Sequence, residues 1–578
     1  MCSQFEMGGT LPRRISIHSG SGEKPVLYAC REMGRYLEKA GHEVVWEGEA
    51  FPIRFTRTED ESLRDGAYRW CVSETGISLE FAHGAGAVYG CYHLLEMAGF
   101  RFLTPDCEVC PGYPLRFPSG EGEEHPAFRV REVFWRSAID GVFAVKMRLN
   151  GSRSNITEEQ GGKAMFFNFS HTFNQLVPVE KYFDTHPEYF SMIRGKRCRD
   201  RTQLCLTNPD VLKLCIEGVL EWKRAHPAYQ VFSVAMNDWY QNCRCPACQA
   251  VDMEEESGAG TMIRFVNAVA EETAKVFPDI RIHTFAYLYC RKPPRHTKPR
   301  ENVIVRLCAI ESCYSHPMEA CGCETGPIDV QYTAAQPFSE PEQNNGFLDH
   351  MKEWSRICPH LYIWDYTTNY ANYLQPFPNL DVLGANLRTF RKAGVEGVLE
   401  QGNFSRGRAS AFGDLKVYLL GHLLWDPDAD QEKLTREFAQ GVWGPGAPFM
   451  LRCAAIMQEA ASHGHMGIYD APDAFYLQDT VLTEAERNVS EALRVTEGTR
   501  FHESVEREAL SFRYVRLVQE KPDTPGHGER VETFGRDAER LGIAELFERR
   551  DFQGSLEVMK TSYLTRDRHL ACPIQYPL

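Results

Sequence analysis

The sequence predicts an α/β protein whose centre is a (β/α)8 TIM barrel, with a small α/β domain before it and a helical region after it. Short apolar runs typical of buried strands alternate with helical stretches between residues 121 and 425. Polar and aromatic residues follow these runs, at the strand ends where parallel barrels carry their functional groups. Beyond residue 426 the patterns are helical. We therefore expect domains at residues 1–120, 121–425 and 426–578.

Composition narrows the class of partner. Lys and Arg total 64 against 79 Asp and Glu, a formal net charge of −15, which argues against nucleic acid or an anionic membrane as the main partner. No apolar run is long enough to span a membrane. The N-terminus lacks the basic and apolar regions of a signal peptide, and the 20 cysteines are spread over the chain, so we expect a reduced, cytoplasmic protein.

The first 120 residues show the pattern of a small α/β domain. Strand-like runs at residues 15–18 and 42–47 flank an amphipathic helix over 25–40. A hairpin is expected over residues 68–81 and a second helix over 85–98. Residues 105–126, rich in Pro, Gly and Glu, predict a linker.

Eight strand-like runs follow, the number that closes a (β/α)8 barrel. They are residues 128–135, 165–169, 203–206, 231–236, 281–288, 303–310, 361–364 and 395–399. The fourth run ends abruptly at Asn237, Asp238, Trp239 and Tyr240, none of which belongs in a strand interior. A helix is expected over 261–277, where apolar residues recur at helical spacing. Asp238 is therefore expected at the catalytic end of a barrel strand.

Side chains at the ends of the other strands are expected to meet Asp238 at one rim. Sugar sites need carboxylates for proton transfer, His and Arg to bind polar substituents, and Trp and Tyr to stack on pyranose faces. The candidate substrate-binding residues are His171, Arg131, Trp239, Tyr287, Tyr289, Trp364, Tyr366 and Gln401, and the further candidate carboxylates are Asp365, Glu400 and Glu311. A single one of these could be a solvated surface group, but their convergence predicts a carbohydrate site.

Two sets of motifs resemble known families. Residues 65–70, 76–79, 84–96 and 99–102 resemble the accessory N-terminal domain shared by family 20 hexosaminidases and family 67 α-glucuronidases. The motifs at 171–173, 186–190 and 203–210, the Asn237-Asp238 pair and Cys243-x-Cys-x-x-Cys248 resemble a bacterial glycoside-hydrolase-like family, domain of unknown function 4838. This second resemblance implies a (β/α)8 barrel related to families 20 and 67, and it leaves the sugar undefined.

Glycoside hydrolysis needs an acid that protonates the leaving oxygen and a second group that attacks or activates the attacker. We expect Asp238 to be the acid, kept protonated by partial desolvation against Met236 and Trp239. Asn237 would hold a substituent on C2 of the sugar. We expect an exo-acting O-glycosyl hydrolase that needs no cofactor for catalysis.

The alternative mechanisms differ in the identity of the second group. In a β-N-acetylhexosaminidase-like enzyme, which we favour, the 2-acetamido group of the substrate is the nucleophile and Asn237 orients it. The Asn-Asp pair is one methylene shorter and one charge poorer than the Asp-Glu pair of family 20. An α-glucuronidase-like or other exo-glycosidase would instead use Asp365 or Glu400, with Glu311 as a third candidate. A carbohydrate-binding barrel without catalysis is the remaining alternative.

Cys243, Cys245 and Cys248 lie too close in sequence to form good disulfides with one another. With one more thiolate they would suit a structural zinc ion. We expect the fourth ligand to come from Cys290 or Cys313, with Cys321 and Cys323 also within reach on the same rim. The alternative is free thiols packed in a loop. A zinc ion here would fix the loop that carries Asp238.

The C-terminal region is expected to be a helical bundle packed on the barrel. Helices are predicted over 409–425, 430–442 and 449–463, with longer charged helices between 483 and 565. This region could lend Trp425 to the rim or provide a homodimer contact.

Overall fold

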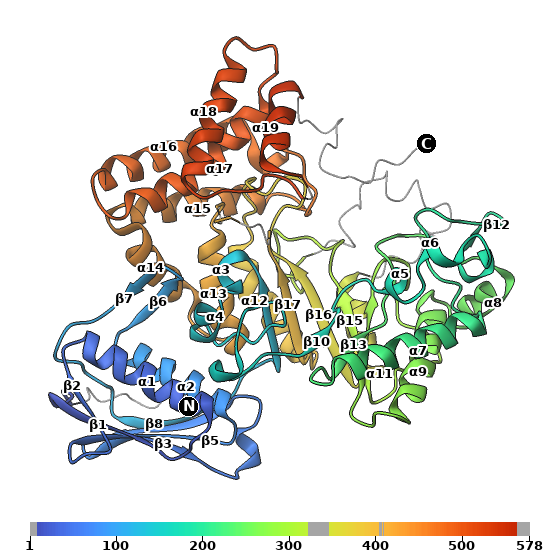
Figure 1. Cartoon of the computed structure of the whole chain (residues 1–578). Coiled ribbons are helices and arrows are strands. Elements are labelled where there is room, and N and C mark those ends of the chain that lie inside the picture. Colours follow the sequence, from blue (N-terminus) through green and yellow to red (C-terminus); the bar gives the residue numbers. More distant parts are fainter. Residues whose placement is uncertain (1–8, 322–345, 404–406, 409, 549, 563–578) are drawn as a thin grey trace.

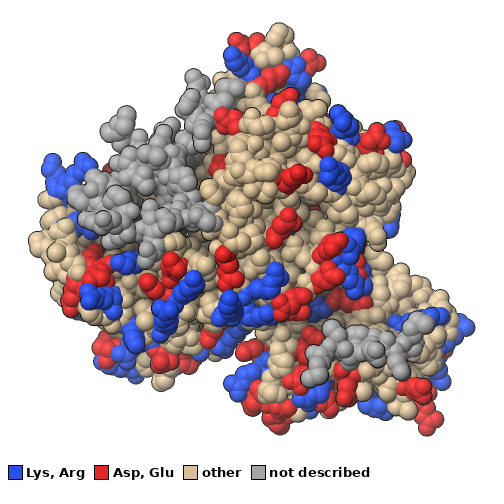
Figure 2. Space-filling view, turned by 180° about the vertical axis from the view of Figure 1, so that it is seen from behind, with Lys and Arg blue, Asp and Glu red and all other residues tan. Residues whose placement is uncertain are grey.

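A computed structural model describes residues 9–321, 346–403, 407–408, 410–548 and 550–562. The fold is mixed α/β: an N-terminal sheet, a central parallel sheet and a C-terminal group of helices follow one another along the chain (Figure 1). Within these described ranges, no helix has the length and apolar character needed to cross a bilayer. Charged side chains of both signs are interspersed on the face seen in Figure 2.

The N-terminal sheet has six strands in the order β2-β1-β3-β5-β4-β8, and helices α1 (Lys24–Lys39) and α2 (Gly84–Met97) pack together on one of its faces (Figure 1). The strands are β1 (Arg14–Ser19), β2 (Glu43–Trp46), β3 (Phe51–Arg57), β4 (Tyr68–Ser73), β5 (Gly76–Phe81) and β8 (Gly120–Glu124). The predicted hairpin and both predicted helices are confirmed.

The linker predicted over residues 105–126 is wrong in two places. Strand β7 (Cys107–Val109) forms a short antiparallel hairpin with β6 (Arg101–Thr104), and β8 adds to the edge of the N-terminal sheet beside β4. Cross-strand ion pairing explains why so acidic a segment is a strand, since Arg69 on β4 contacts Glu123 on β8 at 2.6 Å.

The central sheet has seven strands, all parallel to their neighbours, in the order β10-β13-β14-β15-β16-β17-β9. The strands are β9 (Val130–Phe134), β10 (Phe166–Phe167), β13 (Val231–Ser233), β14 (Arg281–Ala286), β15 (Val303–Cys308), β16 (His360–Tyr366) and β17 (Gly397–Gln401). Seven of the eight predicted strands are thus confirmed, and their carboxyl ends lie along one edge of the sheet.

The predicted strand at residues 203–206 is not in the sheet, and β10 pairs directly with β13. Its backbone is used elsewhere: Cys205 donates to the carbonyl of Tyr189, and the carbonyl of Gln203 accepts from Ser191. The closed eight-stranded barrel is not confirmed. Between the end strands β9 and β10 lies Asn150, which donates to the carbonyl of Arg131 and accepts from Ala164, so loop backbone fills this position.

Helices cover the central sheet, as βα units require. They include α7 (Pro209–Ala225), α9 (Ala259–Ala274), α11 (Phe347–Ile357), α12 (Leu380–Lys392) and α13 (Gly413–Trp425). The helix predicted over 261–277 is confirmed as α9, two residues earlier at its start. Of the helix predicted over 409–425, residues 410–412 do not extend α13, because Ala411 and Phe412 have positive φ, and residue 409 lies outside the described residues.

The C-terminal region is helical, as predicted. It comprises α14 (Gln431–Trp443), α15 (Ala447–Ala461), α16 (Asp479–Thr496), α17 (His502–Gln519), α18 (His527–Arg540) and α19 (Phe552–Thr561). Trp425 does not reach the rim. It stacks on Tyr68 of the N-terminal sheet with ring centroids 5.8 Å apart, and its indole N–H donates to Glu124 at 3.4 Å.

Candidate active site

The tip of β13 carries the Asn237-Asp238 pair at the carboxyl edge of the sheet. Residues 234–236 leave the strand as a buried apolar segment, and the chain turns so that Asp238 emerges with 46% of its side chain exposed. The expected desolvation of this carboxyl against Met236 and Trp239 is therefore not found. The Tyr287 hydroxyl donates to Asp238 Oδ1 at 3.2 Å, and His171 Nε2 lies 3.9 Å from the same oxygen.

His171 is oriented toward Asp238 by its other ring nitrogen. Its Nδ1 lies 2.6 Å from the carbonyl oxygen of Met236. Because a carbonyl can only accept, Nδ1 carries the hydrogen, which leaves Nε2 to face the carboxylate. The structure thus brings His171, Tyr287 and Asp238 together, as the sequence predicts.

The amide of Asn237 is committed to the protein. Its Oδ1 accepts from the backbone N–H of Asn174 at 3.0 Å, and its Nδ2 donates to the carbonyl of Thr202 at 2.8 Å. Both ends of the amide are used, so Asn237 is a structural clamp in this conformation. A primary amide has two N–H donors and two oxygen lone pairs, so its expected contact with a sugar substituent stays a prediction.

Gln203, which the sequence analysis missed as a site residue, holds the backbone on both sides of Asp238. Its Nε2 donates to the carbonyls of Asn237 at 2.8 Å and Trp239 at 2.7 Å, and its Oε1 accepts from Asn237 N–H at 2.8 Å. Gln203 is buried, so these bonds are shielded from water. A lone Gln within an apolar run was the available signal, since a buried Gln must be hydrogen-bonded.

Asp365 and Glu400 form a second acidic station on β16 and β17. They are register partners on these adjacent strands and are 4% and 2% exposed. Asp365 Oδ1 and Glu400 Oε2 are buried and have no hydrogen-bond partner among the described residues. Burial raises the pKa of Asp365 to about 7, and a hydrogen bond from the Tyr366 backbone opposes the shift. Burial and then the charge of Asp365 raise the pKa of Glu400 well above its ordinary value.

A line of aromatic rings runs from Tyr287, which contacts Asp238, to β16, the strand that carries Asp365. Tyr287, Phe285, Trp364 and Tyr366 follow one another with centroids 6.5, 5.6 and 6.5 Å apart. Tyr366 then contacts Tyr314 at 6.3 Å. Burial, followed by the charges of Asp365 and Glu400, raises the pKa of Tyr314 well above its ordinary value, so this ring borders the pair. Trp364 and Tyr366 thus lie where the sequence predicts.

Several other candidates have structural partners. Glu311 forms an ion pair with Arg291, and both side chains are about nine-tenths buried, so this carboxylate is neutralised by the protein. Tyr289 lies toward the cysteines, since burial first and then the charges of Cys290, Asp252, Cys248 and Cys243 raise its pKa. Trp239 is half-buried under the Arg201 guanidinium, which lies 5.3 Å from the ring. Gln401 is buried at the carboxyl edge and its Oε1 has no partner among the described residues.

Arg131 is not at the rim, which corrects its assignment to substrate binding. It occupies the second position of β9, near the amino end of the strand. Its guanidinium donates to the carbonyls of Arg148 and Phe128 at 2.7 Å each, and it lies 5.1 Å from the Trp425 ring. It also lies 5.5 Å from the ring of Tyr89 on α2, so Arg131 links the central sheet to the N-terminal domain.

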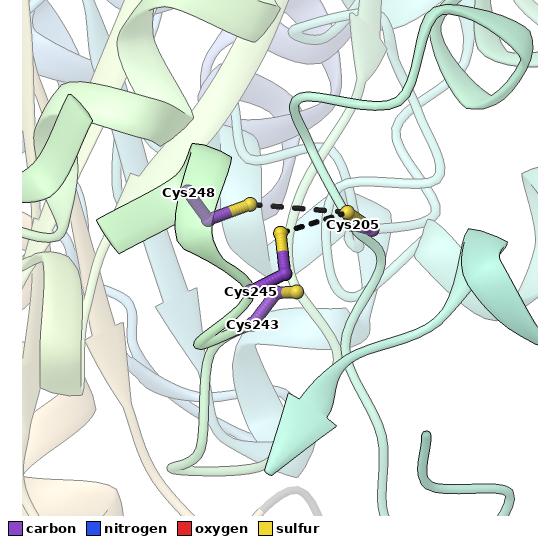
Figure 3. A group of neighbouring side chains, drawn as sticks. All are labelled: Cys205, Cys243, Cys245 and Cys248. Atoms are coloured by element: carbon purple, nitrogen blue, oxygen red, sulfur yellow. Dashed lines mark hydrogen bonds between the residues drawn. The ribbon is translucent and has the colours of Figure 1, made fainter. Parts of the chain in front are cut away.

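Four buried cysteines meet beside the Asp238 loop (Figure 3). Cys243, Cys245 and Cys248 come from the loop and the start of α8 (Pro246–Glu254), as predicted. The fourth is Cys205, which corrects the expectation of Cys290 or Cys313. Cys290 instead lies 3.5 Å from the sulfur of Met236. The signal for Cys205 was its place in the 203–210 motif, but its approach to the cluster is a tertiary contact.

Cys313 belongs to a different group, with His316, Cys321 and His465. Cys321 is disulfide-bonded, so it does not offer a thiolate to a metal. Cys323, the remaining candidate ligand, lies outside the described residues.

Comparison with known proteins gives one family and several distant structures. The family model described as "Domain of unknown function (DUF4838)" matches residues 102–453, more than half of the chain, which confirms the resemblance. A search of curated proteins finds no match.

Among solved structures, a GH138 enzyme targeting pectin rhamnogalacturonan II is 10% identical, with 95% of this chain and 78% of that chain covered and a TM-score of 0.49. A Flavobacterium johnsoniae chitobiase is 12% identical, with 92% and 88% covered and a TM-score of 0.45. A Bacteroides fragilis β-N-acetylhexosaminidase is 12% identical, with 77% and 96% covered and a TM-score of 0.42. These likenesses are distant, so a function has to be argued from the residues of this chain.

Proposed function

This chain belongs to the DUF4838 family, and from the chemistry of its own sheet edge we propose that it is a glycoside hydrolase acting on a non-reducing-end sugar. The observation that carries the proposal is the presence of two unlike acidic stations at the carboxyl edge of one parallel sheet. Asp238 is exposed, whereas Asp365 and Glu400 are buried and incompletely hydrogen-bonded. Two carboxyl groups in different environments are what acid and base roles require.

Asp238 is the general acid in this proposal. A sugar bound over the edge would cover its exposed carboxyl and exclude water from it. The proton passes to the glycosidic oxygen as the bond from C1 to that oxygen breaks. Tyr287 and His171 hold the carboxyl in place, since both approach Oδ1.

The Asp365–Glu400 pair is the second group. Two buried carboxyl groups on adjacent strands cannot both ionise at low cost, so the pair holds one proton and one negative charge near neutral pH. The ionised member takes a proton from the attacking water, or attacks C1 directly. Trp364 and Tyr366 would stack on the sugar, while Asp365, between them in β16, projects from the opposite face of the strand.

An enzyme carboxylate is therefore favoured over substrate assistance. A 2-acetamido nucleophile needs a group to orient it, and both ends of the Asn237 amide are engaged by Asn174 and Thr202. The α-glucuronidase-like or another exo-glycosidase reaction is thus the first candidate, and β-N-acetylhexosaminidase activity the second. Stacking residues suit a neutral or a charged pyranose, so the sugar has to be found by assay.

The test is a panel of aryl glycosides, namely α-GlcA, β-GlcNAc, β-GalNAc, β-Gal and α-GalNAc, assayed with the wild type and Asp238→Asn. We expect turnover of one substrate and a loss of kcat/KM of about 10²-fold or more in the variant. The loss should be larger for leaving groups of high pKa, which need the proton most. The control is Asp184→Asn, an exposed carboxylate paired with Arg199. Binding of sugars with no turnover of any would indicate a carbohydrate-binding protein and overturn the proposal.

A further inference from the structure

We propose that Cys205, Cys243, Cys245 and Cys248 bind one zinc ion, and that this ion fixes the two chain segments that hold Asp238. The cluster lies outside the acid and base stations, so the proposal goes beyond the glycosidase reaction. All four sulfur atoms lie within 4.8 Å of one another, and all four cysteines are buried.

The spacing of the sulfur atoms fits a tetrahedral metal. Cys205 Sγ lies 3.7 Å from Cys245 Sγ and 3.9 Å from Cys248 Sγ (Figure 3). A zinc ion bound at about 2.3 Å to four thiolates would separate the sulfurs by about 3.8 Å. A disulfide would need about 2.05 Å, and the four residues are free cysteines.

Polar groups around the cluster suit thiolates. Cys243 Sγ accepts from the backbone N–H of Met192 at 3.3 Å and from the Arg197 guanidinium at 3.6 Å. The Thr207 hydroxyl lies 3.2 Å from Cys248 Sγ. Four thiolates and Zn²⁺ carry a net charge of −2, which Arg197 and the N–H donors offset. Helix α8 also begins just after Cys245, so its N-terminal N–H groups lie beside the sulfurs.

The segment that leads to Cys205 has little regular structure, although Phe190 and Leu204 anchor it in the main core. The four cysteines form their own buried cluster, joined only by the partly buried Met192 and separate from the main core. Between Ser191 and Cys205 the regular structure is limited to two two-residue strands, β11 (Met192–Ile193) and β12 (Lys196–Arg197). A closed metal site commonly replaces a hydrophobic core in such a region.

The metal connects directly to the position of Asp238. Gln203 lies two residues before Cys205 and bonds the backbone of Asn237 and Trp239. Cys243 lies five residues after Asp238. One ion therefore fixes the segment that supports Asp238 to the loop that leaves it. This makes the ion a positioning element for the proposed acid.

The test is metal analysis of the full-length protein, purified without chelator. We expect zinc bound to the wild type, and a loss of about one equivalent per chain in Cys205→Ser. Cys290→Ser tests the position predicted from sequence, and Cys198→Ser is the matched control on the same segment outside the cluster. Both should keep the full zinc content. Wild type without zinc, zinc unchanged in Cys205→Ser, or iron in place of zinc would each overturn the proposal.

A second measurement keeps the proposal testable if Cys205→Ser folds poorly. Zinc is withdrawn from the wild type with a chelator and then restored, and amide hydrogen exchange is followed. We expect faster exchange over residues 190–206 and 237–248 on removal and recovery on restoration, with exchange in β14 to β17 unchanged. A change in exchange rate that is the same in all segments on zinc removal would overturn the positioning role. Neither readout uses a glycoside, so zinc without any turnover would contradict only the proposed function.

Discussion

Asp365 and Glu400 face each other as register partners on β16 and β17, and each has a buried oxygen without a hydrogen-bond partner among the described residues. A structural carboxylate pair in a core would be satisfied by donors, because an unpaired buried charge is costly. The unpaired oxygens at the carboxyl edge of a parallel sheet therefore suggest a reacting pair.

The pH dependence of kcat/KM tests the pair as the base. The reaction needs an ionised base and a protonated acid, and burial raises the pKa of Asp365 to about 7, so one limb of the profile should have its midpoint near that value. Asp365→Asn removes one member of the pair, so kcat/KM should be about 10²-fold lower than in the wild type. It also removes the charge that raises the pKa of Glu400, so the limb that reports the base should move to a different pH in the variant. A wild-type profile that is flat from about pH 5 to 8 would contradict a base with this pKa.

The same pair predicts how stability depends on pH. The folded pKa of Asp365 is raised, so the folded state binds more protons than the unfolded state between its ordinary pKa and about 7. Wild type should therefore lose stability as pH rises through this window. The free energy of unfolding of Asp365→Asn, relative to that of the wild type, should therefore increase by on the order of 1–4 kcal/mol between low and high pH. Urea unfolding of both proteins at several pH values measures this, and a difference independent of pH would contradict the prediction.

Gln203→Ala should impair the proposed acid without touching it. The change removes the acceptor for Asn237 N–H and the donor to two carbonyls, so Asp238 loses its fixed position. We expect kcat/KM to fall about 10- to 100-fold with the pH profile unchanged in shape. Gln249→Ala, an exposed glutamine on α8, is the control. Equal effects of the two substitutions would show that Gln203 has no positioning role.

Glu311→Gln should affect stability much more than catalysis. The substitution leaves the buried Arg291 guanidinium without its counter-charge, which costs on the order of 3–5 kcal/mol. Thermal unfolding should shift to lower temperature, while kcat/KM per folded molecule should stay within a few-fold of wild type. If activity instead falls about 10²-fold in a well-folded variant, Glu311 rather than the buried pair is the catalytic carboxylate.

Much of the architecture could be predicted because it depends on residue patterns within short segments of the sequence. Apolar runs of strand length ending in polar residues located seven parallel strands and placed Asp238, Asp365 and Glu400 at their carboxyl ends. The strand predicted at residues 203–206 was wrong because an apolar run does not determine which backbone it pairs with. The linker prediction missed β8 because Arg69, which pairs with its acidic segment, is far away in sequence.

The residues alone determined an α/β chain with a helical C-terminal region, an acidic group after the strand predicted at 231–236, and three clustered thiols. Strand periodicity, helix periodicity and motif spacing are properties of short segments. Tertiary structure decided that Asn237 is a clamp, that Arg131 contacts Tyr89 of the N-terminal domain, that Cys205 completes the cluster, and that Asp365 and Glu400 share a buried site. The reason is physical: the hydrogen-bond partner, burial and pKa of a side chain depend on neighbours that only the folded chain brings within a few ångströms.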